Sequence, residues 1–275
     1  MAGILKNETP KITVCIPVHN GAKFIGRAIE SVLEQSLRDF RLEIADNCSS
    51  DETLEVVKGY LSDERIGLVP RSQDIGMYGN FNACLETVQT KYYMLLSHDD
   101  FFCHKGALEI GLNTLENHPA VPAVYCETLF VDEHDKQISR RSFGLSGLVE
   151  SDSVARKSIV TGRNVFGVPL LVRTSAVQYT RYDSTVPNSA DVDFSIGIGQ
   201  GREVYYVQEA LVAIRFHKVN NTARIYSSLE REFLTIADKH KIKLSWLEMI
   251  QIKINNWMVS LKKATFFFYL DKIRN

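Results

Sequence analysis

The sequence KYYMLLSHDDFF, at Lys91–Phe102, joins a short apolar run to the adjacent carboxylates of Asp99 and Asp100. The length of the run, Tyr92–Ser97, is typical of a buried strand. Two carboxylates at the end of a buried strand are costly unless positive charge lies beside them, and a divalent cation carrying a phosphate would provide that charge. The alternative interpretation is a solvated turn after the strand, where Asp is common.

Strand-like and helix-like patterns alternate on the N-terminal side of this stretch. β-branched residues fill Lys11–Val18, which predicts a buried first strand. Apolar residues then recur at helical spacing from Lys23 to about Gln35. The alternation continues with a strand at Phe40–Ala45, a helix at Leu54–Tyr60, a strand at Ile66–Val69 and a helix at Asn80–Thr90. This order predicts an α/β fold with a parallel sheet and helices on both of its faces.

Polar residues follow three of the predicted strands. His19 and Asn20 follow the first, Asp46 follows the second, and Asp99 and Asp100 follow the strand of the opening stretch. In a parallel sheet these positions meet at one edge, where a nucleotide would bind. The sequence contains neither a GxGxxG fingerprint nor a GxxxxGK[ST] phosphate loop, which argues against a nicotinamide enzyme and a P-loop NTPase.

Composition narrows the class of protein further. The 275 residues are 45% hydrophobic and 24% charged, which is ordinary for a globular domain, and the net charge of −1 gives no basic excess for nucleic-acid binding. The five cysteines are scattered without metal-ligand spacing. We therefore expect reduced thiols in a cytoplasmic protein. No apolar stretch approaches the ~20 residues that span a bilayer.

The second half predicts a helix at Lys105–Leu115, a strand at Ala120–Phe130 and a polar loop at Phe130–Glu150. From Ser228 the chain has helical periodicity. Residues 241–275 contain seven Lys/Arg and two Asp/Glu, a local net charge of +5, together with several aromatic residues. Such a segment can lie on an anionic membrane surface, and packing on the catalytic domain is the alternative.

Several stretches together resemble the family 2 glycosyltransferases, which have the GT-A nucleotide-sugar-binding fold. The resemblance covers about Ile12 to Thr222. It rests on ITVCIPVHNGAKFIGRAIESVLEQSL, IADNCSSDET, SQDIGMYGNFNACLETVQTKYYMLLSHDD, NVFGVPLLVRTSAV and SADVDFSIGIGQGREVYYVQEALVAIRFH. The resemblance implies a Rossmann-like, mostly parallel central sheet flanked by helices. Residues 10–104 would form the nucleotide-sugar-binding half, 105–226 the acceptor-binding and catalytic half, and 227–275 a C-terminal helical extension.

The resemblance also implies a donor site. Asp46 would bind the nucleotide base in a pocket lined by Pro17, His19 and Asn20. A carboxylate suits an N–H of uracil because an ionised carboxylate only accepts hydrogen bonds. Arg71 would reach the base or a phosphate, or would be a solvated loop arginine.

The metal site implied by the resemblance uses Mn²⁺ or Mg²⁺. Asp99 would ligate the ion, and Asp100 would be a second ligand or face the donor sugar. His217, in the Arg-x-His stretch, would complete the metal or diphosphate site; a structural histidine is the alternative. The sequence departs from the family pattern at Ser97, where many members have a further acidic residue.

The general base implied by the resemblance is Asp191. The family usually has Glu-Asp here, whereas this chain has Ala190 before Asp191, so Asp193 remains a competing assignment. The two aspartates are two positions apart at a predicted helix start and would face in different directions.

These residues predict an enzyme that transfers a sugar from a nucleoside diphosphate sugar, with UDP favoured, to a saccharide or lipid-linked acceptor. A metal would neutralise the departing diphosphate and Asp191 would deprotonate the acceptor hydroxyl, with inversion. We expect a bacterial protein of cell-surface polysaccharide or O-antigen biosynthesis, cytoplasmic or at the inner face of the membrane. The alternatives are a nucleotidyltransferase and a non-catalytic binding or scaffold protein on a degenerate fold.

Overall fold

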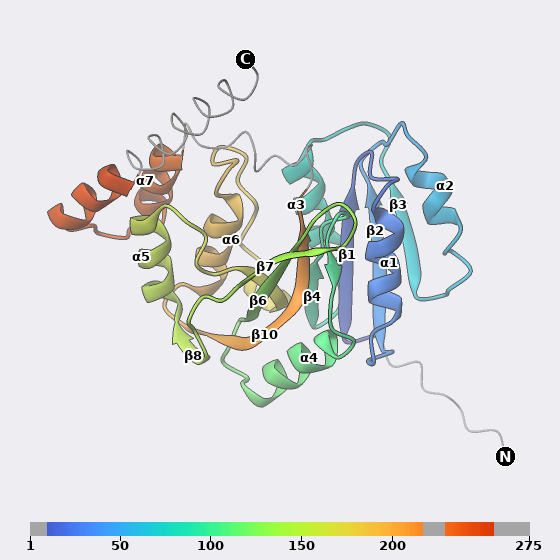
Figure 1. Cartoon of the computed structure of the whole chain (residues 1–275), viewed down its shortest axis with the longest axis horizontal. Helices are drawn as coiled ribbons and strands as arrows, with labels where there is room; N and C mark the ends of the chain where they lie inside the picture. The colour runs from blue at the N-terminus through green and yellow to red at the C-terminus, as the bar shows by residue number, and fades with distance from the viewer. Residues whose placement is uncertain (1–9, 217–228, 256–275) are drawn as a thin grey trace.

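The structure, a computed structural model, describes residues 10–216 and 229–255 (Figure 1). A single sheet runs through both halves of the chain. The elements of the first half are β1 (Ile12–Val18), α1 (Ile25–Leu33), β2 (Phe40–Asp46), α2 (Thr53–Lys58), β3 (Ile66–Pro70), α3 (Met77–Thr87), β4 (Tyr92–Leu95) and β5 (Phe101–Phe102).

The second half adds strands to the same sheet and most of the helices at one end of the molecule. Its elements are α4 (Ala107–Asn117), β6 (Ala123–Val131), β7 (Gln137–Arg141), β8 (Gly147–Glu150), α5 (Ser151–Thr161), β9 (Val168–Arg173), the 3₁₀ helix η1 (Thr174–Ala176), α6 (Ala190–Gly199), β10 (Glu203–Arg215) and α7 (Leu229–Lys239). A further helix covers residues 246–255, the C-terminal helix below. In Figure 1, α5, α6 and α7 gather on the left, and α1 and α2 lie on the right.

The sheet has the order β3-β2-β1-β4-β9-β6-β10-β5. Parallel pairing joins β3, β2, β1 and β4, and a second long parallel pair joins β6 to β10. The strand β9 is antiparallel to both β4 and β6 and so connects the two parallel groups. The predicted α/β fold, with a mostly parallel sheet flanked by helices, is confirmed.

The two faces of the sheet are covered by different helices. Along β1, Val14 and Ile16 point into a core shared with α1, α2 and α4, whereas Cys15 points into a second core with α3, α5, α6 and α7. The strand β4 alternates in the same way, with Met94 on the first side and Tyr93 on the second. This period of two explains why both strands are apolar throughout: each face of each strand is buried.

The predicted loop at Phe130–Glu150 is wrong, because this segment contains two strands. β7 pairs with β6 as an antiparallel hairpin, and β8 pairs with β10. Four of the five β7 residues are exposed, so their polar sequence reflects an edge position rather than a loop. The helix α3 also begins at Met77, three residues before the predicted Asn80. Gly76 and Gly79 made the first turn of this helix resemble a loop in the sequence.

The predicted C-terminal extension is helical where the structure describes it. α7 packs on α5 and α6 through Phe233 and Ile236, and the C-terminal helix buries Ile252 in the same core. His217 and the aromatic residues beyond 255 lie outside the described residues. Among the described helices, none is long and apolar enough to cross a membrane.

Candidate active site

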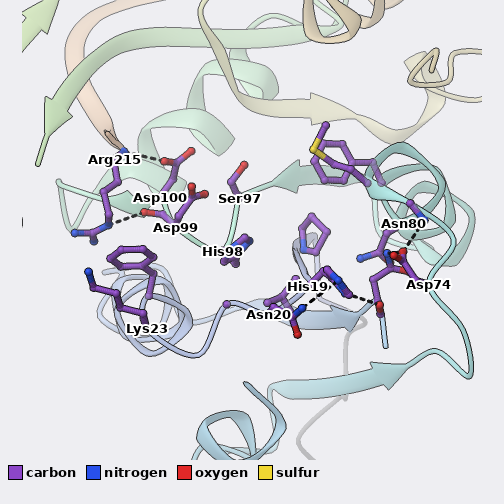
Figure 2. Close-up of a pocket in the computed structure, with 18 of the residues that line it drawn as sticks. His19, Asn20, Lys23, Asp74, Asn80, Ser97, His98, Asp99, Asp100 and Arg215 are labelled. Carbon is purple, nitrogen blue, oxygen red and sulfur yellow. Dashed lines mark hydrogen bonds between the residues drawn. The ribbon is translucent and has the colours of Figure 1, made fainter. Parts of the chain in front are cut away.

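A cavity of about 660 Å³ opens at the edge of the sheet where β1, β2, β4 and β10 end (Figure 2). All four strands run in the same direction, so their carboxyl ends meet there, as in other open α/β sheets. The first turn of α3 forms a further wall, with Met77, Asn80 and Phe81. The volume lies within the usual range for small-molecule sites, ~300–1,000 Å³.

A cluster of two carboxylates and one arginine forms one end of the cavity (Figure 2). The backbone N–H of Arg215 donates to Asp100 at 3.0 Å, and the Arg215 side chain donates to the carbonyl oxygen of Asp99 at 3.0 Å. Burial raises the pKa of Asp100 well above its usual range, and the charge of Asp99 adds to this effect. Two carboxylates on adjacent residues favour the binding of a positive ion beside them.

Backbone turns and amides form the opposite end, with Ser97 and His98 between the two ends (Figure 2). The carbonyl oxygen of Asn47 lies 2.9 Å from Nδ1 of His19. The amide of Asn47 donates to Asp74 and accepts from the backbone of Ile75 at 3.0 Å, which ties the loop before α3 to the end of β2. These contacts create a polar surface of amide and backbone groups that also includes the carboxylate of Asp74.

The turn after β1 requires a glycine. A Cβ at Gly21 would lie 2.4 Å from Cδ2 of His98 and 2.6 Å from Cγ2 of Val18. The preceding Asn20 has a φ of 53°. Its backbone N–H donates to the hydroxyl oxygen of Ser49 at 2.9 Å, and its side-chain oxygen accepts from the backbone N–H of Ser50 at 2.8 Å. The left-handed conformation of Asn20 therefore depends on the loop after β2.

Asp46 and Arg71 lie behind the cavity wall rather than in its lining. Asp46 is 1% exposed; one carboxylate oxygen accepts from the backbone of Ser49 at 3.2 Å, and the other has no hydrogen-bond partner among the described residues. An unpaired buried acceptor costs about 1–3 kcal/mol. Arg71 donates to Asn80 at 2.7 Å, and Asn80 in turn donates to the carbonyl oxygen of Ala45 at 2.8 Å.

Asp191 stands at the start of α6, away from the lining of the cavity. Its side chain is exposed to solvent and accepts from Asn164 at 2.6 Å and from the backbone of Val192 at 2.9 Å. The surrounding protein still desolvates the carboxyl group, which raises the pKa of Asp191, and the hydrogen bond from Asn164 opposes that rise. Burial raises the pKa of Tyr78, on the first turn of α3, and the charge of Asp191 adds to this rise.

Asp193 has a different environment, although it is only two residues away. It is 2% exposed and pairs with Lys239 and His240 of the C-terminal extension at 2.7 Å and 2.8 Å. A carboxylate enclosed by two partners has no open side for an acceptor. The geometry thus favours Asp191 over Asp193 as the base, and the assignment stays a prediction.

The cavity brings together Pro17, His19, Asn20, Asp99 and Asp100, as the sequence predicted. It does not include Asp46, Arg71 or Asp191, and the predicted ligand His217 lies outside the described residues. Sequence reasoning missed Asn47, Asp74, Asn80, Arg215 and Asn164. A signal existed for Asn47, which adjoins Asp46, and for Arg215, which belongs to the Arg-x-His stretch.

Comparison with known proteins agrees with this architecture. The model of the family described as Glycosyl transferase family 2 matches residues 13–165. An uncharacterized glycosyltransferase of Rickettsia prowazekii, RP339, is 25% identical over 257 residues, which cover 89% of this chain and 76% of the relative.

Two solved structures share the fold at low sequence identity. Staphylococcus aureus TarS 1-349 in complex with UDP-GlcNAc has a TM-score of 0.69 at 15% identity, over 88% of this chain and 69% of the TarS 1-349 chain. The mannosyltransferase PcManGT of Pyrobaculum calidifontis, in complex with GDP-Man and Mn²⁺, has a TM-score of 0.58 at 14% identity, over 96% of this chain and 82% of that one.

Proposed function

The chain belongs to glycosyl transferase family 2, and from this membership we propose that it transfers a sugar from a UDP-sugar to an acceptor hydroxyl with inversion. The observation that carries the proposal is the cavity at the strand ends, which has an acidic end at Asp99 and Asp100 and an amide-rich end at Asn20, Asn47 and Asn80. The amide-rich end suits a nucleoside, and the acidic end suits a metal-bound diphosphate. The TarS complex with UDP-GlcNAc supports this choice of donor class.

The nucleotide base would be recognised through Asp46. Its second carboxylate oxygen is buried and lacks a donor among the described residues, so an N–H of a uracil ring could satisfy it. Asp46 lies directly before Asn47, which lines the cavity, so a small displacement of the strand end would expose that oxygen. His19, Asn20 and Pro17 would enclose the ribose and base from the other side.

The residues at the acidic end fit a divalent ion. Asp99 and Asp100 would hold Mn²⁺ or Mg²⁺, and bound metal would neutralise the departing diphosphate. No group of three His, Cys, Asp or Glu side chains in 10–216 and 229–255 is arranged for a metal. Such ions commonly bind one or two carboxylates together with substrate phosphates, so two aspartates suffice, with His217 as a further proposed ligand.

Asp191 would act as the general base on the acceptor hydroxyl. Asp191 is an exposed residue, and desolvation of its carboxyl group raises the pKa, which strengthens it as a base near neutral pH. One base opposite one metal-bound leaving group fits a single in-line displacement, and such a displacement inverts the anomeric centre. Asp193, enclosed by Lys239 and His240, would have a structural role.

Replacing Asn164 by Ala should shift the acid limb of the pH–activity profile to higher pH. The amide of Asn164 stabilises the ionised form of Asp191, so its loss raises the pKa of that carboxyl further. Activity depends on ionised Asp191 and would therefore be lost at a higher pH as the solution is acidified. The measurement is kcat/KM against pH for both proteins, and an unmoved acid limb would assign it to another group.

The experiment that tests the proposed function is turnover of a panel of UDP-, GDP- and dTDP-sugars with Mn²⁺, read as nucleotide release. We expect release from at least one UDP-sugar, increased by saccharide or lipid-linked acceptors. Release from a GDP- or dTDP-sugar alone would correct the donor. Binding of nucleotide without any release would favour the non-catalytic alternative.

The acceptor would be carried at a membrane in cell-surface polysaccharide biosynthesis. The C-terminal helix exposes an apolar face in which Trp246, Leu247 and Ile254 are 75%, 70% and 44% exposed. Exposed lysines at 243 and 253 flank it, while Ile252 on the opposite face packs on the protein. Apolar residues flanked by lysines fit an anionic lipid surface.

We expect the protein to float with vesicles that contain anionic lipid and to remain in solution with neutral vesicles. Replacing Trp246 and Leu247 by Ala should reduce the bound fraction several-fold, because the apolar contact is removed while the charge is kept. The measurement is flotation on a density gradient. Recovery of both proteins in the soluble fraction would contradict the proposed membrane contact.

A further inference from the structure

The turn that carries Asp191 is held from one side by α7. The turn begins at Asn188, passes through Asp191 at the start of α6, and reaches Asp193 within the first helical turn. Residues of α7 and the position directly after it contact both ends of this turn. These contacts join segments about 45 residues apart in sequence.

At the helical end of the turn, Asp193 is enclosed by two cationic or hydrogen-bonding groups. Its oxygens lie 2.7 Å from Nζ of Lys239 and 2.8 Å from Nε2 of His240. The side chains of Asp193 and His240 are 2% and 9% exposed. Lys239 also binds Asp183 at 2.8 Å, and Gln200 at the end of α6 donates to the carbonyl oxygen of His240 at 3.0 Å.

At the other end of the turn, the buried carboxylate of Glu232 accepts hydrogen bonds from Asn188. The backbone N–H of Asn188 donates at 2.8 Å, and its side-chain amide donates to the second oxygen of Glu232. Glu232 is 5% exposed. Glu232 and Lys239 lie seven residues apart on α7, which is two helical turns, so both contacts come from one face of the helix.

We propose that α7 is a positioning element for Asp191, and that Asp193, Lys239, His240 and Glu232 fix the direction of the base toward the acceptor. This inference rests on the proposed function, because it assigns Asp191 as the base. Among the described residues, the side chain of Asp191 accepts hydrogen bonds from Asn164 and the backbone of Val192, so its direction depends on the orientation of the turn. A displacement of about 1 Å in a reacting group can cost ~10²-fold in rate.

Charge alone does not explain the arrangement. Of these four side chains, Asp193 and Glu232 are almost fully buried. Burying a charged group costs free energy, and a buried ion pair adds little net stability compared with apolar packing. Burial raises the pKa of Asp191, and the hydrogen bonds from Asn164 and from the backbone of Val192 oppose that rise. The network contacts Asn188 and Asp193 at the two ends of the turn, whereas Asp191 binds Asn164 and Val192, so the network acts on the geometry of the turn.

The test compares Lys239→Met and Asp193→Asn with the wild-type protein. Lys239 is 42% exposed, so its substitution leaves the fold intact even if Asp193→Asn does not. We expect kcat for transfer to fall about 10- to 100-fold, with UDP affinity and donor KM within twofold of wild type. The acid limb of the pH profile should not move. The double variant should lose less than the product of the two single losses, because it leaves no unpaired buried charge.

Arg156→Met is the matched control. Arg156 binds Glu248 at 2.8 Å and the carbonyl oxygen of Lys243 at 2.9 Å, so it also anchors the C-terminal extension, and it has no hydrogen bond or ion pair with α6 among the described residues. Its kcat per UDP-binding site should equal that of wild type. Equal kcat in Lys239→Met and Arg156→Met would overturn the inference.

Hydrogen exchange separates this inference from the proposed function. In Lys239→Met, the amides of residues 188–193 should exchange at least tenfold faster than in wild type or Arg156→Met, whether or not the protein turns over a nucleotide sugar. Wild-type protein without turnover would refute the function alone. Unchanged exchange across 188–193 would refute the positioning role alone.

Discussion

Replacing Asp191 by Asn should lower the rate of sugar transfer about 10²- to 10⁴-fold, the usual contribution of a general base. Asparagine has nearly the same size and keeps an oxygen that can accept from Asn164, but it cannot take a proton from the acceptor. Binding of UDP should be unchanged, because Asp191 does not line the cavity. The measurement is the initial rate at saturating donor and acceptor, with UDP affinity determined on the same preparation.

A rate above one tenth of wild type would contradict the assignment of Asp191. In that case the base would have to be another group, and Asp193 would return as the next assignment despite its enclosure by Lys239 and His240. The variant Ser195→Ala is a suitable control. Ser195 lies on the same helix, is only 1% exposed and does not line the cavity, so its replacement should leave the rate within about threefold.

Replacing Asp99 by Asn should lower metal-dependent transfer by at least ~10²-fold, because a bound metal stabilises the leaving diphosphate by several kcal/mol. Asparagine keeps the shape of the side chain but removes the negative charge that would hold the ion. In contrast to Asp191→Asn, this variant should also lose the metal-dependent part of UDP binding. The measurement is the transfer rate across a Mn²⁺ titration.

Glu133→Gln is the matched control for Asp99→Asn. Glu133 is an acidic residue that pairs with Lys23 of the cavity at 2.6 Å but does not line the cavity itself. Its rate and its dependence on Mn²⁺ should match wild type within about twofold, as for most surface pairs. If Asp99→Asn behaves like Glu133→Gln, the acidic end of the cavity does not hold a catalytic metal.

The first half of the fold was well predicted because its two signals, the apolar runs of the strands and the period of the helices, are local. In β1 and β4 the apolar runs are buried on both faces, and the helices between them have a clear 3.6-residue period. The polar residues after each strand could be brought together by topology alone, since parallel strands end at one edge. His19, Asn20 and Asp99 met in the cavity for this reason.

The second half was less predictable because its strands are defined by their partners. β7 has the exposed sequence QISRR, and only its pairing with β6 makes it a strand. Similarly, no local pattern connects Asn164 with Asp191, which are 27 residues apart. The choice between Asp191 and Asp193 depended on α7, whose contacts with the turn span more than 40 residues of sequence.

The proposed function requires that the cavity be a metal-dependent UDP site. The measurement that tests this is calorimetric titration of UDP into the wild-type protein, once with Mn²⁺ and once with a chelator. We predict saturable one-site binding with Mn²⁺ that weakens at least tenfold with the chelator. UDP binding that is absent or equally weak under both conditions would contradict the account.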